Sequence, residues 1–545
     1  MKKLFGNLTG LKANQVKRLE KIYQRSIPNE FIITPEFANY ICTLSHELNR
    51  QIGVLVNRRG KTDYVVIGNH NEIFIPDLSE YRIAHARLKG LKCIHTHLKN
   101  EPLTKDDFSD LVFLRLDMIA AVTINRNGGL HQVYCAHILP GNVQQKHYQV
   151  MPPLNSQQLN IDCLGLINDI ESELDLIIPL YDANSQKRER AILVSVTTAS
   201  KTSAMLGLNE LKNLCKSADI DVAETILQQR KKIDPRFLMG TGKLQEMTLI
   251  ALTKAVTLVI FDQELNPSQV RSIANRIDLK VIDRTQLILD IFAQRAQTRE
   301  GKLQVELAQL KYLLPRLSTK NTAMSRLTGG IGGRGPGETK LEINRRRVRD
   351  RIVLLEKTIS KIKKQRKQQK AKRNKKGLPV ISIVGYTNTG KSTLLNTLTK
   401  SNVRAENRLF ATLDPVSRRL KFPKDTEVII TDTVGFIKNL PKDLMAAFRA
   451  TLEELEGADL LLHIIDASNP HFETQIQSVE TILTELHLQH IPIIQVFNKK
   501  DLLDQLTAAE YNNTSNKIAI SANDKSTLAP LIKKIKEAIM QITDS

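Results

Sequence analysis

The stretch Gly385-Tyr-Thr-Asn-Thr-Gly390-Lys391-Ser392 matches the G-x-x-x-x-G-K-[ST] template of a phosphate-binding loop. It follows the apolar run VISIV and opens the helical run STLLNTLT, which is the context that such a loop needs. Glycines let backbone amides converge on a phosphate, the Lys391 ammonium reaches β- and γ-phosphate oxygens, and the Ser392 hydroxyl is a ligand for Mg²⁺. The stretch therefore predicts a site for a nucleoside triphosphate with Mg²⁺.

Two strings further along the chain favour guanine as the base and a γ-phosphate contact. Asp432-Thr-Val-Gly435 follows an apolar run, so its carboxylate can hold the Mg²⁺ shell through water and the Gly435 amide can contact the γ-phosphate. Asn498-Lys-Lys-Asp501 follows IPIIQVF. A carboxylate at Asp501 can accept from N1–H and the exocyclic amine of guanine, whereas adenine presents an acceptor at N1.

Two weaker strings complete the set because of their order along the chain. Ser521-Ala-Asn523 lies where a backbone amide can reach guanine O6, and Thr412, within LFATLDP, is the expected second Mg²⁺ ligand. Either string alone would look like an ordinary loop. The expected nucleotide-binding residues are Gly385, Tyr386, Thr387, Asn388, Thr389, Gly390, Lys391, Ser392, Thr393, Phe410, Ala411, Thr412, Leu413, Asp414, Asp432, Thr433, Val434, Gly435, Asn498, Lys499, Lys500, Asp501, Ser521, Ala522 and Asn523, with Ser392 and Thr412 as Mg²⁺ ligands.

Position 436 bears on the rate of hydrolysis. Many small GTPases place a glutamine after the Asp-x-x-Gly glycine to orient the attacking water, and this chain has Phe436 there. A phenyl ring can neither donate a hydrogen bond to that water nor accept one from it. We therefore name no certain catalytic residue and expect slow GTP hydrolysis by the protein alone, with stimulation by a partner.

The charge of the chain is concentrated in one segment. The 545 residues carry a net charge of +22, and Lys340 to Lys376 contain 17 basic and 3 acidic residues, a local excess of +14. Such a block favours a polyanionic partner, nucleic acid before membrane because no apolar anchor accompanies it, over a merely solvated helical face. Five cysteines without paired spacing argue for a reducing compartment and against a cysteine zinc site. With no signal-peptide pattern and no spanning apolar run, we expect a cytoplasmic protein.

The basic block belongs to a predicted antiparallel hairpin of two helices. Apolar residues recur at helical spacing in two series, Leu303, Leu307, Leu310, Leu314 and Leu317, and then Val348, Ile352, Leu355, Ile359 and Ile362. Between them lies SRLTGGIGGRGPGET, whose glycines cannot sustain a helix, and Pro315 should end or kink the first helix near its top. Glycine-rich backbone with arginines favours contact with phosphates over a passive linker.

The alternation of apolar strand-like runs and amphipathic helices predicts a multidomain α/β protein. We expect an α/β extension at residues 1–184, a small α/β domain with a parallel sheet at 188–297, the hairpin at 298–377, and a doubly wound phosphate-loop domain at 378–545.

A second candidate site lies in the first of these regions, in CIHTHLKNEPLTKDD. His95, His97 and Asp107 can offer two imidazoles and a carboxylate to zinc and leave the fourth position for water. A metal-free structural domain, a metal without hydrolysis, and an active hydrolase all remain open.

Taken together, the strings resemble the HflX family of ribosome-associated GTPases, over about residues 190 to 522. The resemblance rests on GYTN-GKST, LFATLDP and DTVGFI in the last region, and on VIFDQELNPSQ and GGIGGRGPGET before it. It implies a GTPase that converts GTP to GDP and phosphate, binds the large ribosomal subunit and its RNA, and takes part in splitting or rescuing stalled ribosomes under stress. We expect a monomer that associates with ribosomes.

The N-terminal histidine string resembles the H-x-H and S-x-x-D portion of JAB/MPN metalloprotease-like domains, with Thr104 in the serine position. Those enzymes also use a glutamate three residues before a glycine, and here Arg50 precedes Gly53 at that spacing. A guanidinium cannot act as the base, so the departure weakens the prediction of hydrolysis. The alternative function is a GTP-stabilised scaffold whose N-terminal domain is a metal-dependent (iso)peptidase or peptide binder.

Overall fold

The structure is a computed structural model that describes all residues except 1–2, 77, 79–80, 82–86, 140–147, 178–188, 255, 275, 278, 320–339, 375–377, 400–408, 411–415, 422–426, 438–454, 504–515 and 544–545. It contains two compact units, one formed by residues 1–208 with 220–282 and the other by residues 209–219 with 283–545. Three sheets are found in the described ranges, and helices accompany each of them. The protein is therefore a multidomain α/β protein.

The first unit begins with a mixed seven-stranded sheet of order β1-β3-β2-β4-β5-β6-β7. Its strands are β1 (Phe5–Gly6), β2 (Ile52–Asn57), β3 (Thr62–Ile67), β4 (Leu91–His97), β5 (Met118–Ile124), β6 (Leu130–Ile138) and β7 (Tyr148–Val150), and its helices are α1 (Ala13–Glu20), α2 (Pro35–Leu48), α3 (Lys105–Phe113) and α4 (Cys163–Ile177). Alternate residues of β2 enter different cores, with Val54 packing among α2 residues and Leu55 among α3 and α4 residues. Both faces of the sheet are therefore covered, which explains why β4 and β5 are buried along their whole length.

The same unit holds a four-stranded sheet of order β11-β10-β8-β9. Its strands are β8 (Arg190–Thr197), β9 (Asp221–Gln229), β10 (Leu258–Phe261) and β11 (Lys280–Asp283), and its helices are α7 (Thr241–Thr253) and α8 (Pro267–Ala274). Helix α6 (Lys201–Ser217) begins in this unit, and its residues from 209 onward belong to the second unit. β8 pairs in parallel with both β9 and β10, as the alternation of strand and helix patterns predicts.

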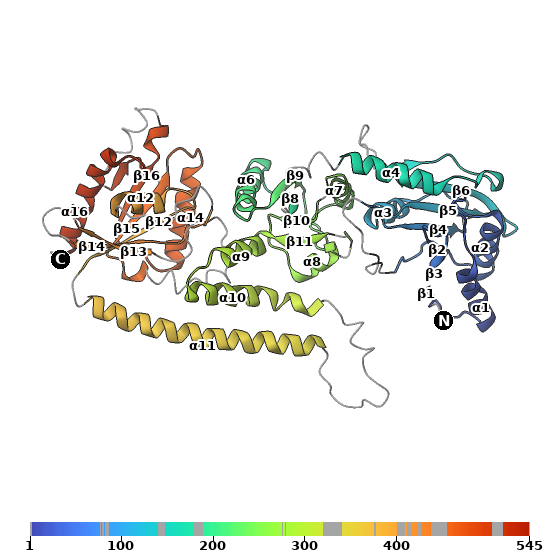
Figure 1. Cartoon of the computed structure of the whole chain (residues 1–545), viewed down its shortest axis with the longest axis horizontal. Helices are drawn as coiled ribbons and strands as arrows, with labels where there is room; N and C mark the ends of the chain where they lie inside the picture. The colour runs from blue at the N-terminus through green and yellow to red at the C-terminus, as the bar shows by residue number, and fades with distance from the viewer. Residues whose placement is uncertain are drawn as a thin grey trace. The chain divides into compact units, whose positions relative to one another are not determined.

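In the second unit, α9 (Arg284–Arg295) leads into two long helices, α10 (Arg299–Leu313) and α11 (Lys340–Asn374), which lie side by side and run in opposite directions (Figure 1). An apolar seam joins α10 and α11, and its members are Leu303, Leu307, Leu310, Leu314, Val348, Ile352, Leu355 and Ile359. α10 ends at Leu313, two residues before Pro315; Leu314 still has helical backbone angles (φ −52°, ψ −48°), and Pro315 has no N–H with which to continue the helical hydrogen bonds. Leu317, in the 3-10 helix after α10, and Ile362 of α11 are not among the seam residues found in the described part of the chain. The glycine-arginine loop falls outside the described residues.

The six-stranded sheet of the second unit has the order β13-β14-β12-β15-β16-β17. Its strands are β12 (Val380–Gly385), β13 (Val416–Lys421), β14 (Glu427–Asp432), β15 (Leu460–Asp466), β16 (Ile493–Asn498) and β17 (Lys517–Ala519), with helices α12 (Lys391–Thr399), α14 (Phe472–Glu485) and α16 (Ala529–Thr543). All pairings are parallel except that of β13 with β14 at the edge. Leu462 of β15 packs with α12 and α16, whereas Ile465 packs with α14, so helices cover both faces.

None of the helices in the described part of the chain combines the length and the apolar character needed to cross a membrane.

Candidate functional site

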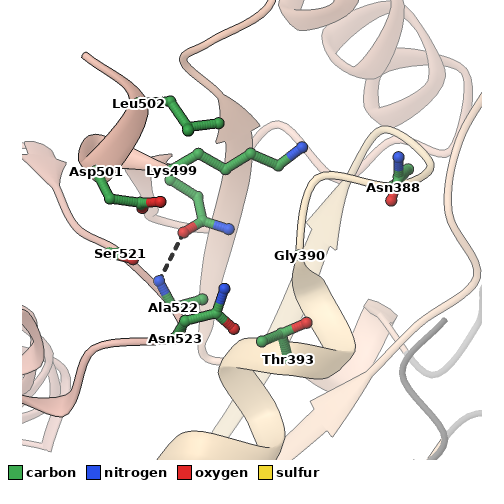
Figure 2. Close-up of a pocket in the computed structure, with 10 residues that line it drawn as sticks. Asn388, Gly390, Thr393, Lys499, Asp501, Leu502, Ser521, Ala522 and Asn523 are labelled. Carbon is green, nitrogen blue, oxygen red and sulfur yellow. Dashed lines mark hydrogen bonds between the residues drawn. The ribbon is translucent and has the colours of Figure 1, made fainter. Parts of the chain in front are cut away.

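The carboxyl ends of the parallel strands bring the predicted strings together. β12 ends at Gly385, β14 at Asp432 and β16 at Asn498, so the residues that follow these strands meet at one edge of the sheet. A cavity of about 270 Å³ lies there (Figure 2). Its lining consists of Asn388, Gly390, Thr393, Asn498, Lys499, Asp501, Leu502, Ser521, Ala522 and Asn523. Nine of these ten are residues that the sequence predicts, and Leu502 is the exception.

Asn498 holds two walls of this cavity together. Its Nδ2 donates to the Thr389 carbonyl oxygen at 2.7 Å, and its Oδ1 accepts from the Ala522 backbone N–H at 2.8 Å, the bond drawn as a dashed line in Figure 2. The side chain is 2% exposed. Gly390 has φ +94°, and a Cβ there would lie 2.2 Å from Asn498 Nδ2, so the close approach requires glycine. Asn498 thus acts as a pin between the phosphate loop and the Ser521-Ala-Asn523 loop.

The opposite wall is formed by the turn after β16. Lys499 has φ +64°, and its Nζ contacts Asp466 Oδ2 at 2.5 Å at the end of β15. Figure 2 shows Asp501 at the left of the cavity and Asn388 of the phosphate loop at its right. A planar base between these walls would have its edge toward Asp501 and its sugar toward the phosphate loop.

The phosphate end of the site is buried. Lys391 Nζ donates to the Tyr386 carbonyl oxygen at 2.6 Å, and Ser392 Oγ donates to Asp432 Oδ2 at 2.6 Å. Burial lowers the pKa of Lys391 to about 8, although the Asp432 carboxylate opposes this shift. Burial removes the Lys391 ammonium from water, which destabilises its charged form, and a bound phosphate would stabilise that charge again.

The donor set beside Lys391 fits Mg²⁺. Ser392 and Asp432 present a hydroxyl and a carboxylate oxygen within hydrogen-bond distance of each other, and hard oxygen donors are what Mg²⁺ prefers. Ser392 would hold the ion directly, and Asp432 would orient its water shell. Bound there, Mg²⁺ would neutralise charge on the phosphate oxygens. The other predicted ligand, Thr412, lies outside the described residues, as do Ala411, Leu413 and Asp414.

The Asp432-Thr-Val-Gly435 string continues into a backbone contact with the phosphate loop. The Thr387 N–H donates to the Phe436 carbonyl oxygen at 2.8 Å, and the Phe436 N–H donates to the Gly385 carbonyl oxygen at 3.1 Å. Thr433 Oγ1 donates to the Ile383 carbonyl oxygen, and Val434 and Phe436 are buried. A Cβ at Gly435 would lie 2.8 Å from Thr387 Cγ2. These side chains therefore pack and position the string, and the ring of Phe436 has no polar atom to direct a water.

One buried polar residue behind the phosphate loop has no signal in the sequence. His463 is in β15, opposite Val384 of β12, and is 2% exposed. Burial, followed by the nearby Lys391 charge, lowers the pKa of His463 to about 4. The side chain is therefore neutral near pH 7. A histidine within an apolar strand pattern gives no hint of this neighbour.

The second candidate site is assembled as its spacing predicts. His95 Nε2 lies 2.9 Å from His97 Nε2 and 3.1 Å from Asp107 Oδ1, and the three ligand atoms are within 4.8 Å of one another. Thr104 caps α3, and its N–H and hydroxyl both donate to Asp107 Oδ2. Burial would raise the pKa of Asp107, but His95 and the Thr104 hydrogen bonds outweigh it and hold the pKa well below its usual range.

The comparisons with known proteins agree with this geometry. Three family models match: GTP-binding GTPase N-terminal at residues 206–293, GTP-binding GTPase middle region at 295–373, and 50S ribosome-binding GTPase at 380–499. GTPase HflX of Caldanaerobacter subterraneus subsp. tengcongensis is 46% identical over 360 residues, which are 66% of this chain and 83% of that protein. GTPase HflX of Escherichia coli is 42% identical over 362 residues, which are 66% and 84% of the two chains.

A solved structure covers a similar share of this chain at lower sequence identity. A GTP-binding protein from the hyperthermophilic archaeon Sulfolobus solfataricus, in complex with GDP, is 26% identical and covers 65% of this chain and 99% of its own. The TM-score between the two structures is 0.35.

The parallel sheet, the phosphate loop and the cavity between them define a P-loop GTPase. With the coverage and identity of its relatives, the chain belongs to the HflX family of GTPases, binds GTP and GDP, and hydrolyses GTP. The matched models begin at residue 206, so the seven-stranded sheet is an additional N-terminal α/β region.

Proposed function

We propose that this GTPase is a Mg²⁺-dependent switch that binds the large ribosomal subunit through the α10–α11 hairpin and acts in ribosome splitting or rescue under stress. The observation that carries the proposal is a row of exposed cations on α11, comprising Arg346, Arg347, Arg349, Lys357, Lys361, Lys363 and Lys364. Ribosomal RNA is the polyanion that such a row fits, and neutralising its phosphates would release counterions.

The packing of α10 against α11 holds the helix that carries these cations in a fixed position. The apolar seam faces inward, and two ion pairs cross between the helices, Arg351 with Glu306 at 2.7 Å and Lys311 with Glu356 at 2.7 Å. The exposed cations are thus carried on a helix whose position is fixed by its partner. The hairpin would then lie against ribosomal RNA.

Co-sedimentation of the full chain with large subunits tests the proposal. We expect stronger binding with a non-hydrolysable GTP analogue than with GDP. Arg346→Glu with Arg347→Glu should weaken binding, and should lower the slope of log affinity against log salt by about 2, since each lost phosphate contact removes about one unit. The matched control, Lys525→Glu with Lys533→Glu, makes the same change of charge at exposed positions outside the hairpin. Equal loss in both variants would show that only net charge matters.

The nucleotide residues have the following proposed roles. Lys391 and the phosphate-loop amides hold the phosphates, Gly435 contacts the γ-phosphate, and Asp501 reads the base. Asp501→Asn should lower GTP affinity and favour xanthosine triphosphate, because an amide can donate where the carboxylate accepts. Unchanged discrimination between the two nucleotides would remove Asp501 from this role.

We propose slow hydrolysis by the protein alone, since Phe436 cannot orient water, and stimulation by large subunits. Turnover measured with and without large subunits tests this part. Equal rates would contradict it while leaving the binding proposal intact.

A second function is favoured by the N-terminal histidines. We propose that this region resembles JAB/MPN domains and that His95, His97 and Asp107 bind zinc without peptidase activity. His97 Nδ1 lies 3.0 Å from the Glu101 carbonyl oxygen, the kind of contact that orients a metal-binding histidine, and this leaves Nε2 for a metal. His95 Nε2 lies on the same side as His97 Nε2 and Asp107 Oδ1.

Neither Arg50 nor Glu47, the carboxylate three residues before it, is arranged to act as the missing base. Arg50 donates to the backbone oxygens of Asn7 and Thr9, and Glu47 pairs with Arg18 at the surface. A Cβ at Gly53, which is opposite His95 in the sheet, would lie 2.8 Å from Ile73 Cδ1.

Metal analysis of the full chain should find one zinc that His97→Ala removes and that the control His131→Ala, at an exposed histidine, retains. Equal zinc in both variants would contradict the site.

A further inference from the structure

Two helices of the second unit contact the nucleotide region, α6 through Glu210 and Ser217 and α9 through Phe292, while Arg284 of α9 binds Glu210. Residues 209–219, the second half of α6, and residues from 283 onward, which include α9, belong to the same compact unit as the six-stranded sheet. Glu210 and Ser217 are seven residues apart on α6, and Arg284 and Phe292 are eight apart on α9, so each pair lies on one face of its helix. One member of each pair is near the phosphate loop, and the other is near the segment before Thr412.

The first contact holds Tyr386 of the phosphate loop. Its carbonyl oxygen accepts from Lys391 Nζ and, at 3.0 Å, from Thr389 Oγ1. Its hydroxyl donates to Glu210 Oε1 in a short hydrogen bond. The residue that anchors the phosphate-binding lysine is therefore itself anchored by a carboxylate of α6.

Glu210 is in turn held by α9. Its Oε2 accepts from Arg284 Nη1 at 2.8 Å, and the side chains of Arg284 and Glu210 are 8% and 16% exposed. In such a poorly exposed ion pair, removal of one hydrogen-bonding group leaves the remaining charged groups buried without full compensation. Loss of any one group should shift the others.

The second contact holds the segment that precedes Thr412. The Leu409 N–H donates to Ser217 Oγ at 2.9 Å. The rings of Phe410 and Phe292 pack edge to face, with their centroids 4.6 Å apart. Leu409 and Phe410 are 7% and 2% exposed. The same two helices thus clamp both the phosphate loop and the start of the segment that carries the predicted Mg²⁺ ligand.

The first turn of α9 also contacts the hairpin, at the C-terminal end of α10 and the short 3-10 helix that follows it (Arg316–Thr319). Asp283, which caps α9 and is fully buried, accepts from the Tyr312 hydroxyl at 2.7 Å through Oδ1, while Arg316 Nη2 lies 3.5 Å from its Oδ2. The Arg316 guanidinium stacks on the Tyr312 ring at 3.4 Å. Asp283 and Arg284 are neighbours in the chain, so one turn of helix is bonded to the hairpin on one side and to the phosphate loop, through Glu210, on the other.

We propose that Glu210 and Arg284 are positioning residues for GTP turnover, which hold Tyr386 in place and couple the phosphate loop to the hairpin through Asp283. When Lys391 turns toward phosphate oxygens, it acts on the residue that Glu210 holds, so the nucleotide state shifts the first turn of α9. By reciprocity, a change at the C-terminal end of α10, where Tyr312 meets Asp283, alters the relative affinities for GTP and GDP. The inference rests on GTP hydrolysis and not on ribosome binding.

The test uses the full chain without ribosomes, so its failure would not bear on the ribosome proposal. Tyr386→Phe, Glu210→Gln and Tyr312→Phe are each compared with Tyr134→Phe, which removes a hydroxyl bonded to Gln132 in the first unit. The measurements are kcat and KM for GTP and the Kd values of GDP and a non-hydrolysable GTP analogue. Nucleotide stoichiometry near one per chain verifies folding.

We expect Tyr386→Phe and Glu210→Gln to change kcat by about fivefold or more with a smaller change in KM, and the double variant to match either single one. Tyr312→Phe, which touches no nucleotide, should change the ratio of the two Kd values by about fivefold, while Tyr134→Phe leaves it unchanged. If Tyr312→Phe lowers only the melting temperature and leaves the ratio as in the parent, the coupling is refuted. Additive effects of Tyr386→Phe and Glu210→Gln would refute the positioning role.

Discussion

Asn498→Ala tests whether the site is pinned as the structure shows. Two buried hydrogen bonds are lost at once, that of Nδ2 to the Thr389 carbonyl oxygen and that of the Ala522 N–H to Oδ1. A buried polar group left without a partner costs about 1–3 kcal/mol, so two groups correspond to about 2–6 kcal/mol. We expect the free energy of unfolding of the second unit to fall by that amount, and GDP affinity to fall with it because Thr389 and Ala522 flank the ligand.

The assay is denaturant unfolding of the full chain, with and without GDP, together with a GDP Kd by fluorescence. Asn469→Ala is the matched control, since its Oδ1 only accepts from the His471 N–H in a surface turn. That control should cost about 1 kcal/mol or less. Asn498→Asp keeps the acceptor toward Ala522 and loses the donor toward Thr389, so its GDP affinity should still fall. A loss below about 1 kcal/mol in Asn498→Ala would refute the pinning argument.

Three further predictions concern other buried groups. The pKa of His463 is lowered from 6.5 to about 4 in the folded protein, so between these pH values the unfolded chain binds more protons than the folded one. The stability that depends on neutral His463 is therefore complete above pH 6.5 and is lost as the pH falls toward 4, with a loss of about 2 kcal/mol at about pH 5. His463→Phe should remove this part of the pH dependence of the unfolding free energy. Asp117→Asn should lower the unfolding free energy of the first unit by about 3 kcal/mol in urea titrations, because the fully buried Asp117 carboxylate accepts two hydrogen bonds from Arg58 and one from the Gly90 N–H. The control Asp221→Asn, which weakens the surface ion pair with Arg190, should cost under about 1 kcal/mol. Gly435→Ala should lower kcat for GTP by about tenfold or more, since its Cβ would lie 2.8 Å from Thr387 Cγ2 and 3.0 Å from Lys391 Nζ; an unchanged kcat would show that the string tolerates the displacement.

Local signals predicted much of the second unit. The phosphate loop was predictable because an apolar strand, a glycine-bounded turn and a helix start fall at a fixed spacing, and β12 and α12 are at those positions. The α10–α11 seam was predictable because apolar residues repeat at the period of a helix, and Pro315 marks its end. The four-domain division and the roles of single site residues remain predictions.

The use of particular side chains was less accessible. Asn498 was expected as part of a base-reading string, but its side chain joins two loops. Leu502 and His463 carried no signal, because a leucine and a strand histidine are unremarkable in an apolar pattern. Glu210 and Tyr386 are separated by 176 positions, so no local rule could have paired them.

The sequence by itself determined the class of ligand, since the residue types that hold phosphates, Mg²⁺ and guanine occur in a fixed order with short spacings. Tertiary structure alone decided which groups support them. Hydrogen bonds between buried side chains depend on how helices such as α6 and α9 pack, and packing brings together residues whose distance along the chain carries no information about their distance in space.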